Sequence, residues 1–224
     1  MDNKRVDNLP EPVKKIFESM LRRRPDLKMS AEALLDFYAS LVNVYDKKGK
    51  LIIAGNGGSN ADAVHIVGEL EKSFIRKRPL PPDFSARLEV EPFGNELAKH
   101  LEVGFPAIAI GTATALKTAV ENDSPLRDIS FAQETYAMIK PDDLFLGIST
   151  SGNAVNVLMA MSVARAKGAK IASLTGPEGG KMAEYADIAI KTPGENTAFI
   201  QEYHIVVYHT FCAMVEAHYF SDPE

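Results

Sequence analysis

The stretch LIIAGNGGSNADAVHIVGEL, residues 51–70, joins an apolar run to a helix through a glycine-containing loop. The apolar run over 51–55 has the length and composition typical of a buried strand in a parallel sheet. Gly55, Gly57 and Gly58 permit positive φ angles and let a ligand approach the main chain closely. Because the first amides of a helix have no intrahelical partner, this junction favours an anion, although an ordinary tight turn gives the same pattern.

Two residues of the following helix carry side chains that are suited to catalysis or metal binding. His65 and Glu69 are four residues apart, about one helical turn, so both project from one face. A hydrogen bond within the helix explains such a pair without any function. The alternative is an imidazole and a carboxylate aimed at the ligand that the glycine loop binds.

Outward from this stretch, short apolar runs alternate with helical patterns to the end of the chain. The runs expected as strands are 50–55, 106–111, 143–149, 170–176 and 188–193, and a long helix is expected over 196–220. Such alternation is typical of a parallel sheet covered by helices on both faces. The sequence therefore predicts an α/β fold with five parallel strands.

Helical periodicity also precedes the first strand. Residues 11–24 and 30–47 repeat apolar side chains at steps of three and four, as amphipathic helices do. We therefore expect an N-terminal helical hairpin over residues 1–48, followed by the main domain over 49–224.

Residues 75–104 interrupt the alternation. They are rich in proline and charge and contain no strand-like run, although NELAKHLE (95–102) is compatible with a short helix. An insertion of this length in a compact domain is usually functional or mobile. A surface excursion without a role is the other explanation.

The third expected strand ends in a second loop that is suited to an anion. GISTSGNAVNV (147–157) places Ser149, Thr150 and Ser151 together before Gly152 and a helix. Three hydroxyls and the free amides of a helix start suit a phosphate monoester, and no lysine is present for a triphosphate. If the first and third strands are neighbours, the two loops face each other where the winding of the sheet reverses.

Composition excludes several classes of function. The 224 residues carry a formal net charge of −5, so no broad nucleic-acid footprint is expected. The densest basic stretch, KKIFESMLRRR (14–24), is interpreted as a solvated helix face. Cys212 is the only cysteine and lies in an apolar helical stretch, so a buried inert thiol is expected. No signal peptide or membrane-length apolar run is present, and we expect a cytoplasmic protein.

Four segments together resemble the SIS (sugar isomerase) domain family, most of all its phosphoheptose isomerase members. They are GNGGSNADAVHIVGEL (55–70), GISTSGNAVNV (147–157), SLTGPEGGKMAEYADIAI (173–190) and IQEYHIVVYH (200–209). The resemblance extends over the chain except for residues 75–104. It implies a flavodoxin-like five-stranded sheet and a homotetramer with active sites at subunit interfaces.

The resemblance also implies which residues bind a sugar phosphate. Matching positions are Asn56, Gly57, Gly58, Ser59, Glu69, Asn122, Asp123, Ser149, Thr150, Ser151 and Gln201. Two positions depart from the family: Ala154 stands where a further serine is usual, and Ser73 where an arginine is common. These departures and the insertion at 75–104 indicate a subfamily with an altered sugar.

By the same resemblance, the reaction is aldose–ketose isomerisation through a cis-enediol. Sedoheptulose 7-phosphate and glycero-manno-heptose 7-phosphate are the expected pair, with Glu69 as the base and His209 as the acid. Zinc is expected on His65, Glu69, Gln201 and His209, and no nucleotide cofactor is needed. His204, on the same helix, is interpreted as structural or interfacial.

Two alternatives use the same fold without turnover. One is a regulator that binds a protein partner, as the SIS relative that binds the replication initiator does, and the other is a phosphosugar sensor. Such protein-binding relatives lack the glutamate and the last-helix histidine, so Glu69 and His209 favour the enzyme. The partners expected are a phosphorylated sugar and further copies of the chain, with neither nucleic acid nor membrane.

Overall fold

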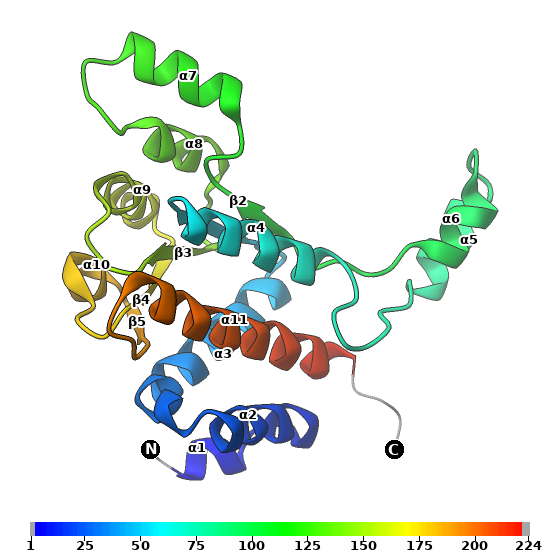
Figure 1. Cartoon of the computed structure of the whole chain (residues 1–224). Coiled ribbons are helices and arrows are strands. Elements are labelled where there is room, and N and C mark those ends of the chain that lie inside the picture. The colour runs from blue at the N-terminus through cyan, green and yellow to red at the C-terminus, as the bar shows by residue number, and fades with distance from the viewer. Residues whose placement is uncertain (1–2, 221–224) are drawn as a thin grey trace.

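The computed structural model describes residues 3–220, and a five-stranded parallel sheet forms its centre (Figure 1). The strand order is β2-β1-β3-β4-β5. The strands are β1 (Leu51–Gly55), β2 (Ala107–Ala109), β3 (Leu144–Ser149), β4 (Lys170–Thr175) and β5 (Ile188–Lys191). The predicted α/β fold with a flavodoxin-like sheet is confirmed. Because β1 pairs with both β2 and β3, the winding reverses between β1 and β3, as the two-loop hypothesis requires.

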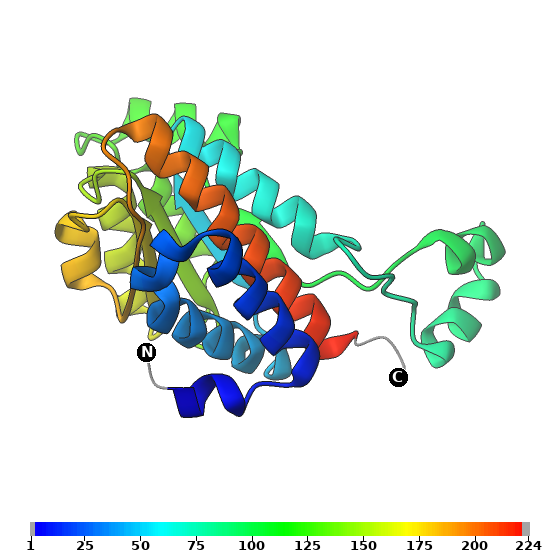
Figure 2. The same cartoon turned by 60° about the horizontal axis from the view of Figure 1, so that its bottom comes forward.

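Helices cover both faces of the sheet (Figures 1 and 2). Leu51 and Ile53 of β1 belong to one hydrophobic core and Ile52 and Ala54 to the other, because alternate side chains of a strand point to opposite faces. The first core is covered by α2 (Glu11–Arg23), α3 (Ala31–Asp46), α4 (Gly58–Glu71) and α11 (Thr197–Tyr219). The second is covered by α8 (Ser130–Met138), α9 (Val155–Ala166) and α10 (Gly180–Tyr185).

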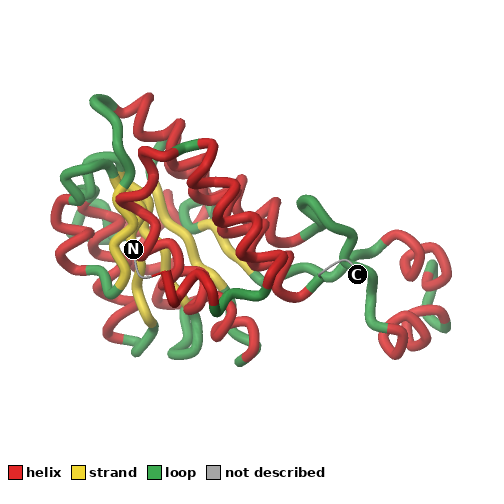
Figure 3. The backbone as a smooth tube through the Cα atoms, turned by 90° about the horizontal axis from the view of Figure 1, so that it is seen from below, coloured by secondary structure: helices red, strands yellow, loops and turns green. Residues whose placement is uncertain are grey.

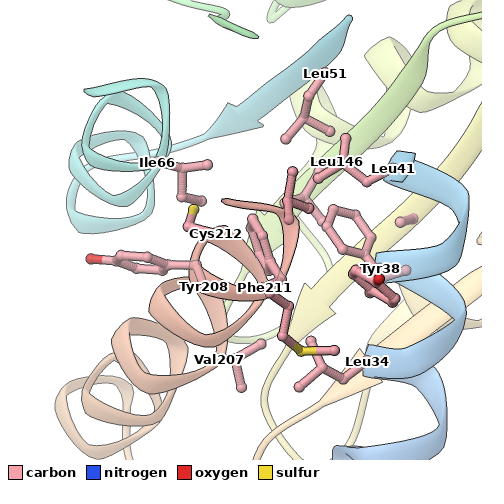
Figure 4. Close-up of a cluster of buried hydrophobic side chains, with 14 of the residues drawn as sticks. Leu34, Tyr38, Leu41, Leu51, Ile66, Leu146, Val207, Tyr208, Phe211 and Cys212 are labelled. Atoms are coloured by element: carbon pink, nitrogen blue, oxygen red, sulfur yellow. The ribbon is translucent and has the colours of Figure 1, made fainter. Parts of the chain in front are cut away.

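The N-terminal helices form the predicted hairpin and share the first core with the sheet. They are α1 (Asn3–Asp7), α2, the 3-10 helix η1 (Pro25–Ser30) and α3. Figure 4 shows Leu34 and Leu41 of α3 beside Phe211 of α11 and Leu146 of the sheet. Phe211 is fully buried, a site where truncation to alanine typically costs about 3–5 kcal/mol. The division of the chain at residue 48 stays a prediction, since one core joins the two parts.

Residues 75–104 form an arm that projects from the body (Figures 2 and 3). It carries α5 (Pro82–Glu89) and α6 (Gly94–His100), and the chain returns to the sheet before α7 (Thr114–Asp123). The short helix expected over 95–102 is confirmed, whereas α5 and α8 were not expected from the sequence. Both are short segments, of eight and nine residues, so each offers too few turns for a clear helical period.

Two further expectations concern the lone cysteine and membrane-spanning helices. Cys212 is buried, as predicted. None of the helices between residues 3 and 220 combines the length and apolarity that a membrane span requires.

Candidate active site

The two strand-end loops meet in a small cup of about 180 Å³ beside the start of α11. Its lining comprises Asn56, Gly58, Ser59, Ile148, Ser149, Thr150, Thr197 and Gln201. The hydroxyl oxygens of Ser149 and Ser151 are 3.5 Å apart, and α4 begins at Gly58. Hydroxyl donors beside a helix start form the kind of seat that an anion occupies.

Ser59 does not cap α4, although a serine at a helix start often does. The residue at the N-cap is Gly57, with φ +53°, and no side chain caps the helix there. A left-handed φ of this kind favours glycine. Ser59 therefore lies buried in the first turn, where its hydroxyl lines the cup.

An amide pair that the sequence did not reveal joins the two loops. The side chains of Asn56 and Asn156 exchange two hydrogen bonds, each of 2.8 Å. The Oδ1 atom of Asn156 also accepts from the amide of Val157 at the start of α9. This pair fixes the distance between the first and second loops. The pattern GNAVNV contains Asn156, but only the pairing of β1 with β3 makes its partner evident.

Gly58 brings the last helix against the first loop. A Cβ atom at Gly58 would lie 2.1 Å from Nε2 of Gln201, so any larger residue displaces that side chain. The absent side chain therefore creates the space in which Gln201 reaches the cup.

A cluster of three potential proton-transfer or metal-binding groups lies further along α4 and α11. Nε2 of His65 is 3.0 Å from Oε1 of Glu69 and 3.4 Å from Nε2 of His209. The plain structural explanation, a bond within α4, is thus correct for His65 and Glu69, but a third group from α11 joins them. The Glu69 side chain is 15% exposed and that of His65 44%. The cluster is therefore partly desolvated and still open to a ligand.

Two buried residues that sequence reasoning missed support this cluster. The Tyr208 hydroxyl lies 2.9 Å from Nδ1 of His65 and donates to Oδ1 of Asp62 at 3.4 Å. Burial raises the pKa of Asp62 to about 6. Burial, followed by the neighbouring His65, lowers the pKa of His209, which favours its neutral form. Asp62 lies one turn before His65, which is the one sequence signal that could have found it.

Arg78, near the base of the arm, donates hydrogen bonds to the main chain of α4 at Glu69 and Leu70. The buried guanidinium of Arg78 donates to the carbonyls of Glu69 and Leu70 at 2.9 and 2.5 Å. It pairs with the buried carboxylate of Glu216 at 2.9 Å. Ser73 accepts a hydrogen bond from the amide of Arg78, so the residue standing in place of the family's arginine serves the base of the arm.

The three-residue cluster fits a zinc ion. One donor atom each from His65, Glu69 and His209 lie within 4.8 Å of one another. Two imidazoles and a carboxylate are ligands that zinc accepts, and catalytic zinc sites commonly have three protein ligands and one open position. Gln201 lies in the cup, eight residues before His209 on α11, a rise of about 12 Å along the helix.

One expected pair of substrate residues does not reach the cup within the chain. Asn122 and Asp123 end α7, where both are exposed and their side chains hydrogen-bond to each other at 3.0 Å. Neither lines the cup. His204, in contrast, is fully buried within the chain, so of its two expected roles the structural one is supported.

A doubly wound sheet with a hydroxyl-lined cup beside an acid–base cluster is the architecture of a phosphosugar-binding domain. The chain belongs to the SIS domain family, whose model matches residues 93–218. Its relatives in that family include phosphoheptose isomerases. The chain is 38% identical over 175 residues to the phosphoheptose isomerase of Aneurinibacillus thermoaerophilus, covering 78% of this chain and 76% of the relative.

Two further comparisons agree. The phosphoheptose isomerase of Roseiflexus sp. (strain RS-1) is 34% identical over 200 residues, which cover 89% of each chain. The solved structure of phosphoheptose isomerase from Neisseria gonorrhoeae superposes with a TM-score of 0.68 at 29% identity, covering 92% of this chain and 98% of that one. The expected family resemblance is confirmed.

Proposed function

We propose that this protein is a phosphoheptose isomerase that interconverts sedoheptulose 7-phosphate and glycero-manno-heptose 7-phosphate. The relatives that match three quarters or more of the chain at 34–38% identity carry that name, as does the solved structure at 29% identity. The observation that carries the proposal is the convergence of Glu69 and His209, from two separate helices, beside the hydroxyl-lined cup.

The phosphate occupies the cup. Ser149 and Thr150 of the second loop and Ser59 of the first line the cup and supply hydroxyl donors. Ser151 is exposed and is not among the lining residues, but its hydroxyl lies 3.5 Å from that of Ser149 and supplies a further donor beside the cup. Asn56, Gly57 and Gly58 shape the other wall with the free amides at the start of α4. Gln201 then contacts the sugar between the cup and the cluster.

Proton transfer takes place at the cluster. Glu69 removes the proton from C1 of the ketose while His209 gives a proton to the carbonyl oxygen at C2, which yields the cis-enediol. Return of a proton to C2 from Glu69, with transfer of the C1 hydroxyl proton to His209, gives the aldose and restores both groups. Both groups must lie within about 3 Å of the atoms they serve, and their position on two packed helices supplies that precision.

A zinc ion is proposed on His65, Glu69 and His209, at about one ion per chain. Gln201, expected from the sequence as a fourth ligand, lies in the cup about 12 Å before His209 along α11 and is not proposed as a ligand. When bound, zinc polarises the substrate carbonyl as a Lewis acid. No nucleotide cofactor is required by the reaction. We further propose a homotetramer in which Asn122 and Asp123 of one copy reach the site of another, because α7 holds them exposed and away from their own cup.

Glu69→Gln tests the proposal, with aldose formation followed by NMR. We expect a loss of turnover of about 10³-fold or more, since a neutral amide cannot act as the base, while binding of the sugar phosphate is retained. Glu71→Gln is the matched control, because Glu71 is exposed on the same helix, and it should keep activity. Full activity of Glu69→Gln refutes the proposal. A wild-type protein that binds phosphosugars without turning any over indicates the sensor alternative.

A further inference from the structure

A groove separate from the cup runs between α2 and α11. Its volume is about 660 Å³, and its lining includes Glu11, Lys15, Ile16 and Arg23 of α2, Phe74, Ile75 and Arg76 at the base of the arm, and His209 of α11. Its wall is thus partly apolar, and three basic side chains outnumber the single carboxylate of Glu11, which lies 3.7 Å from Lys15. The proposed reaction uses His209 at one side of this groove and leaves the α2 side and the basic stretch 14–24 without a role.

The arm carries an apolar tip that nothing in its own chain covers. Val90 is 83% exposed and Phe93 85%. Phe93 has φ +64°, a left-handed conformation that is rare for an aromatic residue and that is usually retained for a reason. Helices α5 and α6 contribute no side chain to either hydrophobic core. Helices of eight and seven residues are too short to be stable without a packed face.

The base of the arm is rigid, so the tip cannot fold back onto its own groove. The Glu216 carboxylate accepts hydrogen bonds from the amides of Phe74, Ile75 and Arg76, each of 2.8 Å, as well as from Arg78. The two chain segments that join the arm to the body are linked by a β-bridge between Pro79 and Glu102 and by a hydrogen bond from the amide of Val103 to the carbonyl of Arg78. In Figures 2 and 3 the arm accordingly points away from the body.

Tip and groove are complementary in charge and in polarity. The tip sequence EVEPF (89–93) combines two exposed carboxylates with two exposed apolar side chains. The groove combines apolar lining with the exposed bases Lys15 and Arg23, and its one acidic lining residue, Glu11, leaves the positive charge in excess. Buried apolar contacts surrounded by matched charges are the usual composition of a specific protein interface.

We propose that the arm tip of one copy docks into the α2–α11 groove of a second copy. The groove adjoins the base of the arm, because Phe74 and Ile75 belong to both. A two-fold axis that passes midway between the tip and the groove lets each copy insert its tip into the other's groove, which is the reciprocal contact that two-fold dimers form. The inserted Val90 and Phe93 lose their exposure, and the tip forms a wall of the groove that His209 lines.

Cross-linking between differently labelled copies tests the contact. Phe93→Cys and Ser19→Cys are introduced into separate full-length chains, which are co-expressed with two tags and treated with a short bismaleimide; Ser19 lines the groove. We expect a cross-linked heterodimer that neither variant gives alone. The control pairs Phe93→Cys with Met138→Cys, an exposed site on α8, and the native Cys212 is buried. Absence of the heterodimer, or an equal yield with the control pair, overturns the proposal.

Charge reversal supplies a second test. Glu89→Lys with Glu91→Lys on the tip, or Lys15→Glu with Arg23→Glu in the groove, should lower the cross-linking yield several-fold at low salt, and combining both sets should restore it. All four residues are exposed, so folding is retained and is checked by circular dichroism. A yield unchanged by either reversal contradicts the proposal. The assay reads assembly alone, so it stands or fails separately from the isomerase activity.

Discussion

The Nε2 atoms of His65 and His209 lie 3.4 Å apart although 144 residues separate them in the chain. They are brought together because α4 and α11 pack side by side over one face of the sheet (Figure 1). Both helices begin at the cup, α4 with Gly58 and α11 with Thr197. A ligand held at the cup therefore lies along two helices that carry reactive groups about two to three turns further on.

Gly58→Ala should weaken substrate binding without unfolding the protein. The new methyl group would lie 2.1 Å from Nε2 of Gln201, and a flexible amide moves away more easily than backbone does. We expect KM for the sugar phosphate to rise about tenfold or more with a free energy of unfolding changed by about 1 kcal/mol or less. Gly68→Ala is the control, because nothing lies within 4 Å of its added Cβ. Equal kinetics for the two variants would contradict the role given to Gln201.

Ser151→Ala should act on phosphate recognition alone. Loss of one hydroxyl donor should weaken binding of the phosphorylated sugar by roughly ten- to 150-fold, in line with about 1.5–3 kcal/mol for a hydrogen bond to a charged group. Binding of the unphosphorylated sugar, measured by calorimetry, should not change. Ser162→Ala serves as the control, because the Ser162 hydroxyl donates to the Leu158 carbonyl within α9 and does not line the cup. Equal losses of affinity for the phosphorylated and the unphosphorylated sugar would contradict the proposal that the phosphate binds at the cup.

Arg78→Met should destabilise the fold strongly. Arg78 and Glu216 are both fully buried and paired, and removing one partner of a buried ion pair typically costs about 3–5 kcal/mol. The carbonyls of Glu69 and Leu70 lose their donor as well. Urea denaturation measures the effect, with Lys99→Met as control because its pair with Glu96 is exposed. A loss of stability below about 1 kcal/mol, the typical cost at an exposed pair, would show that the fold does not depend on the Arg78–Glu216 ion pair.

The free energy of unfolding should decrease at acidic pH because the buried His204 resists protonation in the folded state. Burial lowers the pKa of His204 to about 4 from an ordinary 6.5, so the unfolded chain binds the proton more tightly between these values. The contribution is fully present above pH 6.5 and is lost as the pH falls towards 4, up to about 3 kcal/mol. His204→Leu should flatten this part of the stability profile, whereas exposed His100→Leu should not. Identical slopes for wild type and His204→Leu would refute the assignment.

Metal content provides an independent check on the cluster. Elemental analysis of tag-free protein purified without chelator should find about one zinc per chain, because donor atoms of His65, Glu69 and His209 lie within 4.8 Å of one another. His65→Gln should lower the zinc content severalfold, and His100→Gln, at an exposed site, should leave it unchanged. Wild-type protein without zinc would contradict the metal site and would leave Glu69 and His209 as the acid–base groups without a metal.

The strands and the two anion loops were predictable because both depend on local sequence. An apolar run such as 144–149 is buried on both faces, and a glycine or serine loop before a helix has the same chemistry wherever it occurs. Asn156, Asp62 and Tyr208 were not predictable, because each acquires its meaning from a partner that only the tertiary packing supplies. The projection of the arm depends likewise on Arg78 and Glu216, 138 residues apart.

The most direct measurement is a crystal structure of the Glu69→Gln variant with sedoheptulose 7-phosphate. Our account predicts the phosphate among Ser149, Thr150 and Ser151, with C1 and C2 within about 3.5 Å of the side chains at positions 69 and 209. A phosphate bound elsewhere, or a sugar whose first two carbons point away from both helices, would contradict it.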